Sequence, residues 1–265
     1  MDDERCADSS PKSKGLLGRD DPSPVFVVNK GGSSPFLLLG DHAGRAIPRK
    51  LNGLGLAPEA LDQHIAWDIG IHGLGERLSA LLDATFIRQS YSRLVVDCNR
   101  KHTAADFVAP VSDGQAIPGN ADLKTSDRSA RRREIHMAYH HRITGALEAR
   151  DQQALDTVLV ALHSFTPSMN GIDRPWHYGV LHRGDSKASA KLLGVLRAEF
   201  GDALVGDNQP YAMDGVDYTI PFHADPRGLD YLEIEIRQDL IADAAGQAEV
   251  AERLAALLPQ ILGRP

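Results

Sequence analysis

Two histidines stand at the ends of apolar runs, and their positions indicate chemistry. His42 closes the run PFLLLGDH (35–42), and His163 lies near the end of the run TVLVALHS (157–164). Continuously apolar runs of this kind are typical of strands buried in a parallel sheet. In an open α/β sheet, ligands bind beyond the carboxyl ends of the strands. We therefore interpret the two histidines as ligands of one metal ion.

The identity of the metal follows from its ligands. Imidazole and carboxylate groups suit Zn²⁺, and a catalytic zinc site holds three protein ligands and keeps a fourth position open for water. Asp68, in the segment HIAWDIG, is the favoured third ligand. Asp41 is the weaker candidate, since it adjoins His42 and would have to bend back past it. The prediction is one Zn²⁺ per chain, bound by His42, His163 and Asp68, although Asp68 in a helix pattern also fits an ion pair within that helix.

Other polar side chains follow strand-like runs and are expected at the same sheet edge. They are Asp41, Asp97, Asn99, Arg100, Asp207, Asn208, Glu233, Glu235 and Arg237. The last three alternate with apolar residues, so the two-residue period of a strand places them on one face. Charged groups on one face of a buried strand indicate a functional site. The alternative is that this strand lies at an exposed edge of the sheet, where Glu and Arg form a ladder of ion pairs.

The elements that must position these residues follow from the hydrophobic pattern. Seven segments have the composition of strands: 25–29, 35–42, 85–90, 157–164, 177–184, 203–209 and 232–238. Four segments, 61–83, 126–150, 187–200 and 247–262, repeat apolar residues at the helical period. This alternation predicts an α/β fold, a single domain with a mixed, mostly parallel sheet flanked by helices on both faces. Residues 101–125 form a long loop, and loops of that length often serve a site.

Composition and charge narrow the function. A chain of 265 residues, 42% of them hydrophobic, can bury one large core. A net charge of −7 argues against broad nucleic-acid binding, and we interpret the basic run 131–133 as a solvated helix face. No apolar run approaches the roughly 18 residues that cross a bilayer. We expect neither a nucleic-acid nor a membrane partner.

The cysteines and the N-terminal segment indicate a compartment. Cys6 and Cys98 lie far apart and outside any CxxC pair, which indicates a reducing compartment and excludes a cysteine-built zinc site. Residues 1–24 are polar and turn-rich, without the pattern of a signal peptide. The sequence predicts a disordered tail over 1–24, a domain over 25–265 and a cytoplasmic location.

Six short motifs carry a resemblance to a known family. GDHAGRAIP, SRLVVDCNR, YHHRI, LHSFTP, GDNQPY and LEIEIRQDLI occur in order over residues 35–240. Together they resemble the N-formylglutamate amidohydrolase family, which is similar in fold to zinc exopeptidases and therefore implies a phosphorylase/hydrolase-like fold. LHSFTP, VDCNR and EIEIRQD also resemble segments of zinc carboxypeptidases. Those enzymes place a glutamate three residues after their first histidine, where this chain has Arg45, so the carboxylate ligand must come from elsewhere.

The resemblance implies roles for further residues. The E-x-R alignment makes Glu235 the general base, and Glu233 a supporting or structural residue. Arg100, beside Asn99, is similar to the segment that holds the substrate carboxylate in exopeptidases, and a guanidinium fork suits that task. Arg93 and Arg45 are the second and third candidates, and each of these arginines could instead form a structural ion pair. His223 and Tyr211 lie in loop-like segments that are candidates for lining the pocket.

The implied activity is hydrolysis of a linear amide bond. Zn²⁺ lowers the pKa of its bound water towards ~7 and polarises the carbonyl, and a carboxylate moves the proton. The substrate is expected to be a small N-acyl amino acid such as N-formylglutamate, an intermediate of histidine degradation. Hydrolysis of another N-acyl amino acid or a small cell-wall peptide is the alternative within enzymes. A catalytically silent amino-acid-binding domain is the alternative outside them, but a silent relative would be expected to have lost one of His42, His163 and Glu235.

Overall fold

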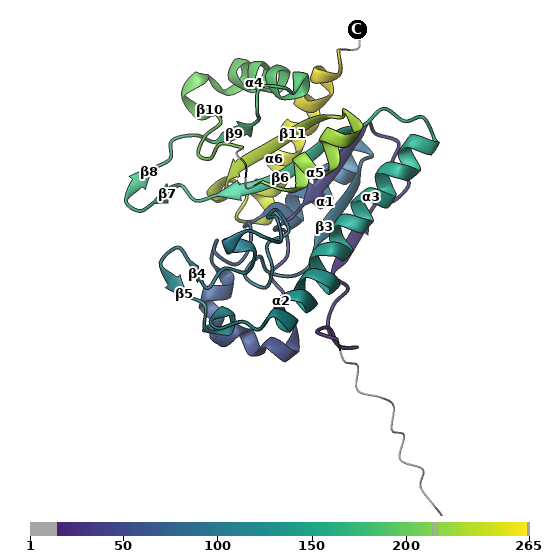
Figure 1. The fold of residues 1–265 in the computed structure, drawn as a ribbon. Helices are drawn as coiled ribbons and strands as arrows, with labels where there is room; N and C mark the ends of the chain where they lie inside the picture. The colour runs from purple at the N-terminus through teal and green to yellow at the C-terminus, as the bar shows by residue number, and fades with distance from the viewer. Residues whose placement is uncertain (1–14, 214, 216, 264–265) are drawn as a thin grey trace, which may run out of the picture.

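The computed structural model describes residues 15–213, 215 and 217–263 (Figure 1). Residues 1–14 of the expected tail lie outside the described residues. The remainder of that segment contacts the domain: Leu16 is buried, and the Tyr91 hydroxyl donates to the carbonyl of Pro22 at 2.6 Å. No helix in the described ranges is both long and apolar enough to span a bilayer.

A seven-stranded sheet forms the centre of the molecule, in the order β1-β3-β2-β6-β11-β9-β10. Its strands are β1 (Val25–Val28), β2 (Phe36–Gly40), β3 (Thr85–Gln89), β6 (Val158–Phe165), β9 (Tyr178–Leu181), β10 (Val205–Asp207) and β11 (Asp230–Arg237). The four strands β3, β2, β6 and β11 run parallel. β1 pairs antiparallel at one side, and β9, with β10 parallel to it, pairs antiparallel to β11 at the other. All seven predicted strands are present, and the predicted mixed, mostly parallel sheet is confirmed.

Helices cover both faces of the sheet, as predicted (Figure 1). On one face α1 (Ile71–Leu82), α4 (Lys187–Phe200) and α6 (Ala244–Leu257) pack in a single apolar cluster with alternate residues of the strands. On the other face α3 (Met137–Gln152) and α5 (Thr219–Ala224) pack in a second cluster. Along β2 the side chains alternate between the two clusters, with Leu38 in the first and Leu37 and Leu39 in the second. Burial on both faces explains why the strands are continuously apolar.

Several predicted boundaries are wrong. The helix expected over 61–83 begins only at Ile71, because Gly70 adopts a φ of 86° and lies against the carbonyl of Ile241, where a Cβ would clash at 2.2 Å. The segment expected over 126–150 is three helical pieces: α2 (Thr125–Arg131), a π-helical turn (Arg132–His136) and α3. Residues 94–100, which resemble a strand in sequence, form turns, and α5 was not predicted.

The long segment 101–125 contains only short elements. These are the two-stranded hairpin β4 (Val111–Ser112) and β5 (Gln115–Ala116) and two 3₁₀ turns, Ala105–Val108 and Pro118–Asn120. A similar small hairpin, β7 (Ser168–Met169) and β8 (Ile172–Asp173), follows β6. In Figure 1 both hairpins project from the body of the sheet.

The connections around β2 create the crevice for a site. From β2 the chain passes through α1 to β3 on one side, and from β3 it passes through α2 and α3 to β6 on the other side. The carboxyl ends of β2 and β6 therefore lie at a topological switch point, where open α/β sheets bind ligands. β10 runs opposite to these strands, so the expectation that Asp207 and Asn208 join the same edge is wrong.

Close approach of two loops completes this edge. A Cβ on Gly44 would lie 2.2 Å from the backbone of Ser90, so only glycine lets the segment after β2 pass so near the segment after β3. The contact is fixed by the amide of Ser92, which donates to the carbonyl of Ala46 at 2.9 Å. Arg93 and Asp97, which follow β3, are thereby brought close to His42.

Candidate metal centre and active site

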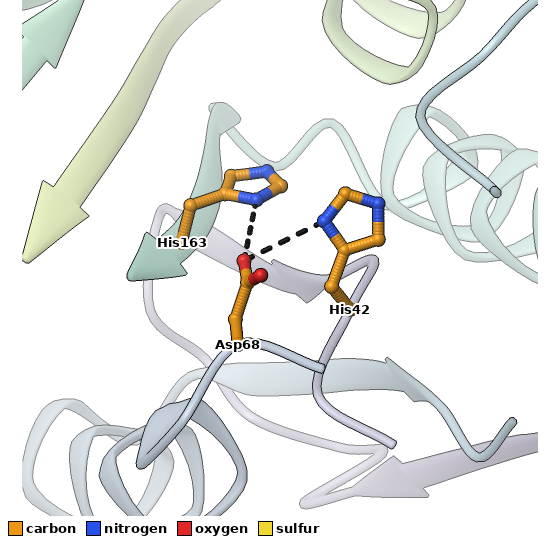
Figure 2. Close-up of side chains that lie close together, drawn as sticks. All are labelled: His42, Asp68 and His163. Carbon is orange, nitrogen blue, oxygen red and sulfur yellow. Dashed lines mark hydrogen bonds and ion pairs between the residues drawn. The ribbon is translucent and has the colours of Figure 1, made fainter. Parts of the chain in front are cut away.

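Two histidines and one aspartate converge at the switch point (Figure 2). Asp68 Oδ2 lies 2.9 Å from His163 Nδ1 and 3.5 Å from His42 Nδ1. The three potential ligand atoms lie within 4.8 Å of one another, and all three residues are buried. These are the three residues predicted from the sequence as metal ligands, and the structure brings them together as a group that could hold a metal ion.

Each residue reaches the cluster from a different element. His163 is the sixth residue of β6, and His42 follows β2 by two residues. Asp68 lies in the loop before α1 and not inside a helix, so the sequence-based alternative of a helix-internal ion pair is wrong. Its amide donates to the carbonyl of His42 at 2.9 Å, and the amide of Ser164 donates to its Oδ2 at 3.3 Å. The backbone therefore holds Asp68 between the two strand ends.

A second carboxylate lies behind each histidine. Asp97 Oδ1 is 2.7 Å from His42 Nε2, and Asp41 Oδ2 is 3.4 Å from His163 Nε2. Histidines that ligate metals commonly donate their other ring N–H to a carboxylate, which fixes the tautomer and leaves the first nitrogen free. His42 Nδ1 is buried, and within the described part of the chain its polar neighbour is Asp68 Oδ2 at 3.5 Å, beyond good hydrogen-bond geometry. This donor set fits a Zn²⁺ ion.

The charges around the cluster favour a cation. Burial opposes the charged form of both histidines, yet nearby carboxylates outweigh it. They raise the pKa of His42, through Asp97 and Asp68, and they raise the pKa of His163 well above its ordinary value, through Asp41 and Asp68. The pKa of Asp68 is lowered although it is buried, because both histidines lie against it. Without a metal the cluster attracts protons, so a metal ion must compete with them.

Two glutamates line the same cavity from β11. Glu235 pairs in register with His163 on the neighbouring parallel strand, and Glu233 lies two residues earlier on the same face. Both are buried, so the alternative of an exposed edge ladder is wrong. Burial raises the pKa of Glu235 to about 7 and that of Glu233 to about 8. Arg237 does not join them; it lies at the end of β11 and pairs with Asp239.

Two of the predicted arginines line the cavity, and both are already paired. Arg93 contacts Asp68 at 3.3 Å and Asp97 at 3.0 Å. These two carboxylates outweigh the effect of burial and raise the pKa of Arg93. Arg100 contacts Asp106 at 2.8 Å and Asp217 at 3.3 Å. Each guanidinium thus faces two carboxylates before any substrate binds.

The structure gives three other predicted substrate-binding residues a different place. Asn99 lines the cavity, but its side-chain oxygen accepts from the amides of Tyr218 and Thr219, which orders the start of α5. Arg45 is largely exposed, pairs with Asp62, and does not line the cavity. His223 is buried behind the site and faces His140, with 3.0 Å between ring nitrogens. Arg45 and His223 are therefore not part of the cavity wall.

The cavity has a volume of about 490 Å³. Its wall includes the 101–125 segment, through residues such as Asp106 and Val111, as expected of a long loop. Tyr211, a predicted pocket residue, lines it from the loop after β10. The space suits a small molecule with a few converging polar groups.

The sequence does not predict the partners of the candidate ligands. It predicts Asp97 at the end of a strand, but the hydrogen bond between Asp97 and His42 depends on a loop. Asp41, the weaker candidate for the third ligand, lies instead on the far side of His163, 3.4 Å from its Nε2. Adjacency to His42 in the sequence was the available signal for Asp41; none in the sequence pairs Asp97 with His42.

Comparisons with known proteins give a family match. A family model described as N-formylglutamate amidohydrolase matches residues 34–242. Among solved structures, a gene product of Agrobacterium tumefaciens is 35% identical, with a TM-score of 0.89 over 93% of this chain and 98% of that one. An N-formylglutamate amidohydrolase from Ralstonia eutropha is 20% identical, with a TM-score of 0.65 over 91% of this chain and 97% of that one, and supports the fold. No curated protein matches.

Proposed function

The chain belongs to the N-formylglutamate amidohydrolase family, and from this premise we propose that it is a zinc-dependent hydrolase of N-acyl amino acids. The observation that carries the proposal is the convergence of His42, Asp68 and His163 at the switch point. Glu235 lies on the strand beside His163, where a general base is needed. A binding domain has no need of a buried carboxylate next to such a cluster.

A metal ion bound by the cluster would supply a Lewis acid. Zn²⁺ held by His42, His163 and Asp68 would polarise the substrate carbonyl and lower the pKa of bound water. Arg93, fixed by Asp68 and Asp97, lines the cavity beside the cluster, and its N–H groups are candidate hydrogen-bond donors to the carbonyl oxygen, where negative charge develops in the transition state. The pair of carboxylates holds the guanidinium in place before the substrate arrives.

Glu235 and Glu233 have different roles in proton transfer. Glu235 takes a proton from the attacking water and returns it to the amide nitrogen as the C–N bond breaks. The water oxygen remains in the carboxylate product, and the amino acid leaves as the amine. Glu233, with a pKa raised to about 8, is mostly protonated at neutral pH and reduces the negative charge that the substrate meets.

Within this proposal the substrate is N-formylglutamate, and hydrolysis releases formate and glutamate, a step that fits histidine degradation. The protein would act in the cytoplasm on this small molecule. Its buried free thiol, Cys98, suits a reducing compartment.

The test is release of amine from a panel of substrates. Protein stripped with a chelator and then reloaded with one equivalent of Zn²⁺ is assayed with N-formyl and N-acetyl derivatives of glutamate, aspartate and leucine. We expect hydrolysis only by the reloaded protein, with N-formylglutamate among the substrates cleaved. Stoichiometric zinc binding without release of amine from any of them would leave a binding domain in place of an enzyme.

A further inference from the structure

One arginine beside the cavity differs in its partners from Arg93 and Arg100. Arg174 follows the β7–β8 hairpin, and its Nη1 donates to the hydroxyl of Tyr211 at 3.0 Å and to that of Thr166 at 3.2 Å. Its guanidinium also lies over the Tyr211 ring, 4.8 Å from the centroid, and Nη2 contacts the Met169 sulfur. These three partners all line the cavity. The guanidinium is therefore held in one position against the cavity wall.

No described carboxylate forms an ion pair with Arg174. Its contacts are two hydroxyls, one thioether and one aromatic ring, all without formal charge. Arg93 and Arg100, in contrast, are each neutralised by two carboxylates, and a third carboxylate would be repelled by that pair. Arg174 thus keeps a positive charge that a substrate anion can use.

We propose that Arg174 is a positioning residue that makes the site selective for acidic N-acyl amino acids. It fixes the Tyr211 hydroxyl in the cavity wall and places a positive charge directly behind that wall, where a side-chain carboxylate of the substrate binds. This inference rests on the proposed function, and it assigns the selectivity to a residue outside the six family-like motifs. Arg174 does not itself line the cavity and lies behind Tyr211, Thr166 and Met169. In an N-acyl amino acid the α-carboxylate is one carbon away from the scissile amide, so the side-chain carboxylate is the group that can extend to the Tyr211 side of the cavity.

Tyr211 connects this position to the chemistry. Burial raises the pKa of its hydroxyl, and the charge of Glu235 acts in the same direction, which places the hydroxyl within electrostatic reach of the general base. Because the oxygen accepts from Arg174, its own O–H is left to donate. A carboxylate at this point would accept a hydrogen bond from Tyr211, and the positive charge of Arg174 behind the hydroxyl strengthens that bond.

The experiment compares an acid with its neutral isostere. The zinc-loaded wild type and Arg174→Gln are assayed with N-formylglutamate and N-formylglutamine, and the ratio of their kcat/KM values is taken as the selectivity. We expect Arg174→Gln to lower kcat/KM for the glutamate derivative about 10- to 100-fold, the scale of a charge-assisted hydrogen bond, and to leave the glutamine derivative nearly unchanged. Arg174→Lys should keep part of the selectivity, because it keeps the charge and loses the planar fork.

Arg253→Gln is the matched control, since Arg253 also lies over an aromatic ring, that of Phe200, and does not line the cavity. It should retain the wild-type selectivity. An equal loss on both substrates in Arg174→Gln, or an unchanged ratio, would overturn the inference. Calorimetric binding of L-glutamate and L-glutamine separates it from the proposed function. If the protein hydrolyses no substrate but binds glutamate more tightly than glutamine, and Arg174→Gln abolishes that preference, the proposed enzymatic function is refuted while the inference about Arg174 is supported.

Discussion

Substitution of Asp97, the carboxylate beside His42 Nε2, tests whether the proposed metal centre depends on the tautomer of His42. Asp97 Oδ1 lies 2.7 Å from His42 Nε2, so in the metal-bound state the proton would reside on Nε2 and the lone pair of Nδ1 would be left for the metal. In Asp97→Asn the amide can donate to Nε2, which moves the proton to Nδ1, the atom that must bind the metal. The substitution keeps the size of the side chain and reverses the tautomer.

The expected effect is a loss of zinc affinity of about 10- to 100-fold, the range found when such supporting partners of metal ligands are changed. This corresponds to about 1.4–2.7 kcal/mol. Asp97 also pairs with Arg93 and accepts from the amide of Asn99 at 2.8 Å, so circular dichroism and thermal melting must first show that the variant folds. Competition against a chromophoric chelator at fixed pH then gives the dissociation constant.

The chain contains a matched control at the opposite sheet edge. Asp207 Oδ1 lies 2.9 Å from His182 Nε2, an Asp–His pair of nearly the same geometry that lies outside the cavity wall. Asp207→Asn should leave zinc affinity unchanged. If Asp97→Asn folds and binds zinc as tightly as Asp207→Asn, the tautomer argument is refuted, and with it the role of Asp97 at the metal centre.

The remaining predictions concern the ligands, the base and acid stability. His42→Ala and His163→Ala should each lose stoichiometric zinc by elemental analysis, and full zinc in both would refute the ligand set. Glu235→Gln should retain zinc, yet its turnover should fall about 10²- to 10⁴-fold in steady-state kinetics, the usual contribution of general acid–base catalysis; full activity would move the base to another residue. Burial lowers the pKa of His136 and that of His223 to about 4, so the unfolded chain takes up protons below about pH 6.5 while the folded protein does not. Each of these histidines should therefore lower the free energy of unfolding by up to about 3 kcal/mol as the pH drops from about 6.5 to about 4. Glu233 and Glu235, whose pKa values are raised, act in the opposite direction over part of this range, so the histidine contribution is isolated by a variant. Urea unfolding of the wild type and of His136→Gln at pH 7 and pH 5 measures it: the wild type should lose more stability, or gain less, than the variant, and an equal pH dependence of the two would contradict it.

Local pattern in the sequence was enough to predict the sheet and the three residues of the candidate metal cluster. Strands buried on both faces are continuously apolar, and α4 repeats its apolar residues at the helical period, so these elements could be recognised without knowing their neighbours. His42 and His163 could be paired because parallel strands end at one edge of a sheet. The family resemblance rested on the same short segments.

Tertiary structure decided what local pattern cannot encode. The reversed direction of β9 and β10 removed Asp207 from the site, and strand direction depends on the path of the chain and not on strand composition. The helical period continued through Asp68, but packing of Gly70 against Ile241 ended the helix and freed Asp68 to reach the histidines. The ion-pair partners of each arginine also depend on the tertiary structure, because they are the carboxylates that the fold brings within hydrogen-bond distance. Arg93 and Arg100 acquired two each, and Arg174, which no sequence motif marks, acquired none among the described residues.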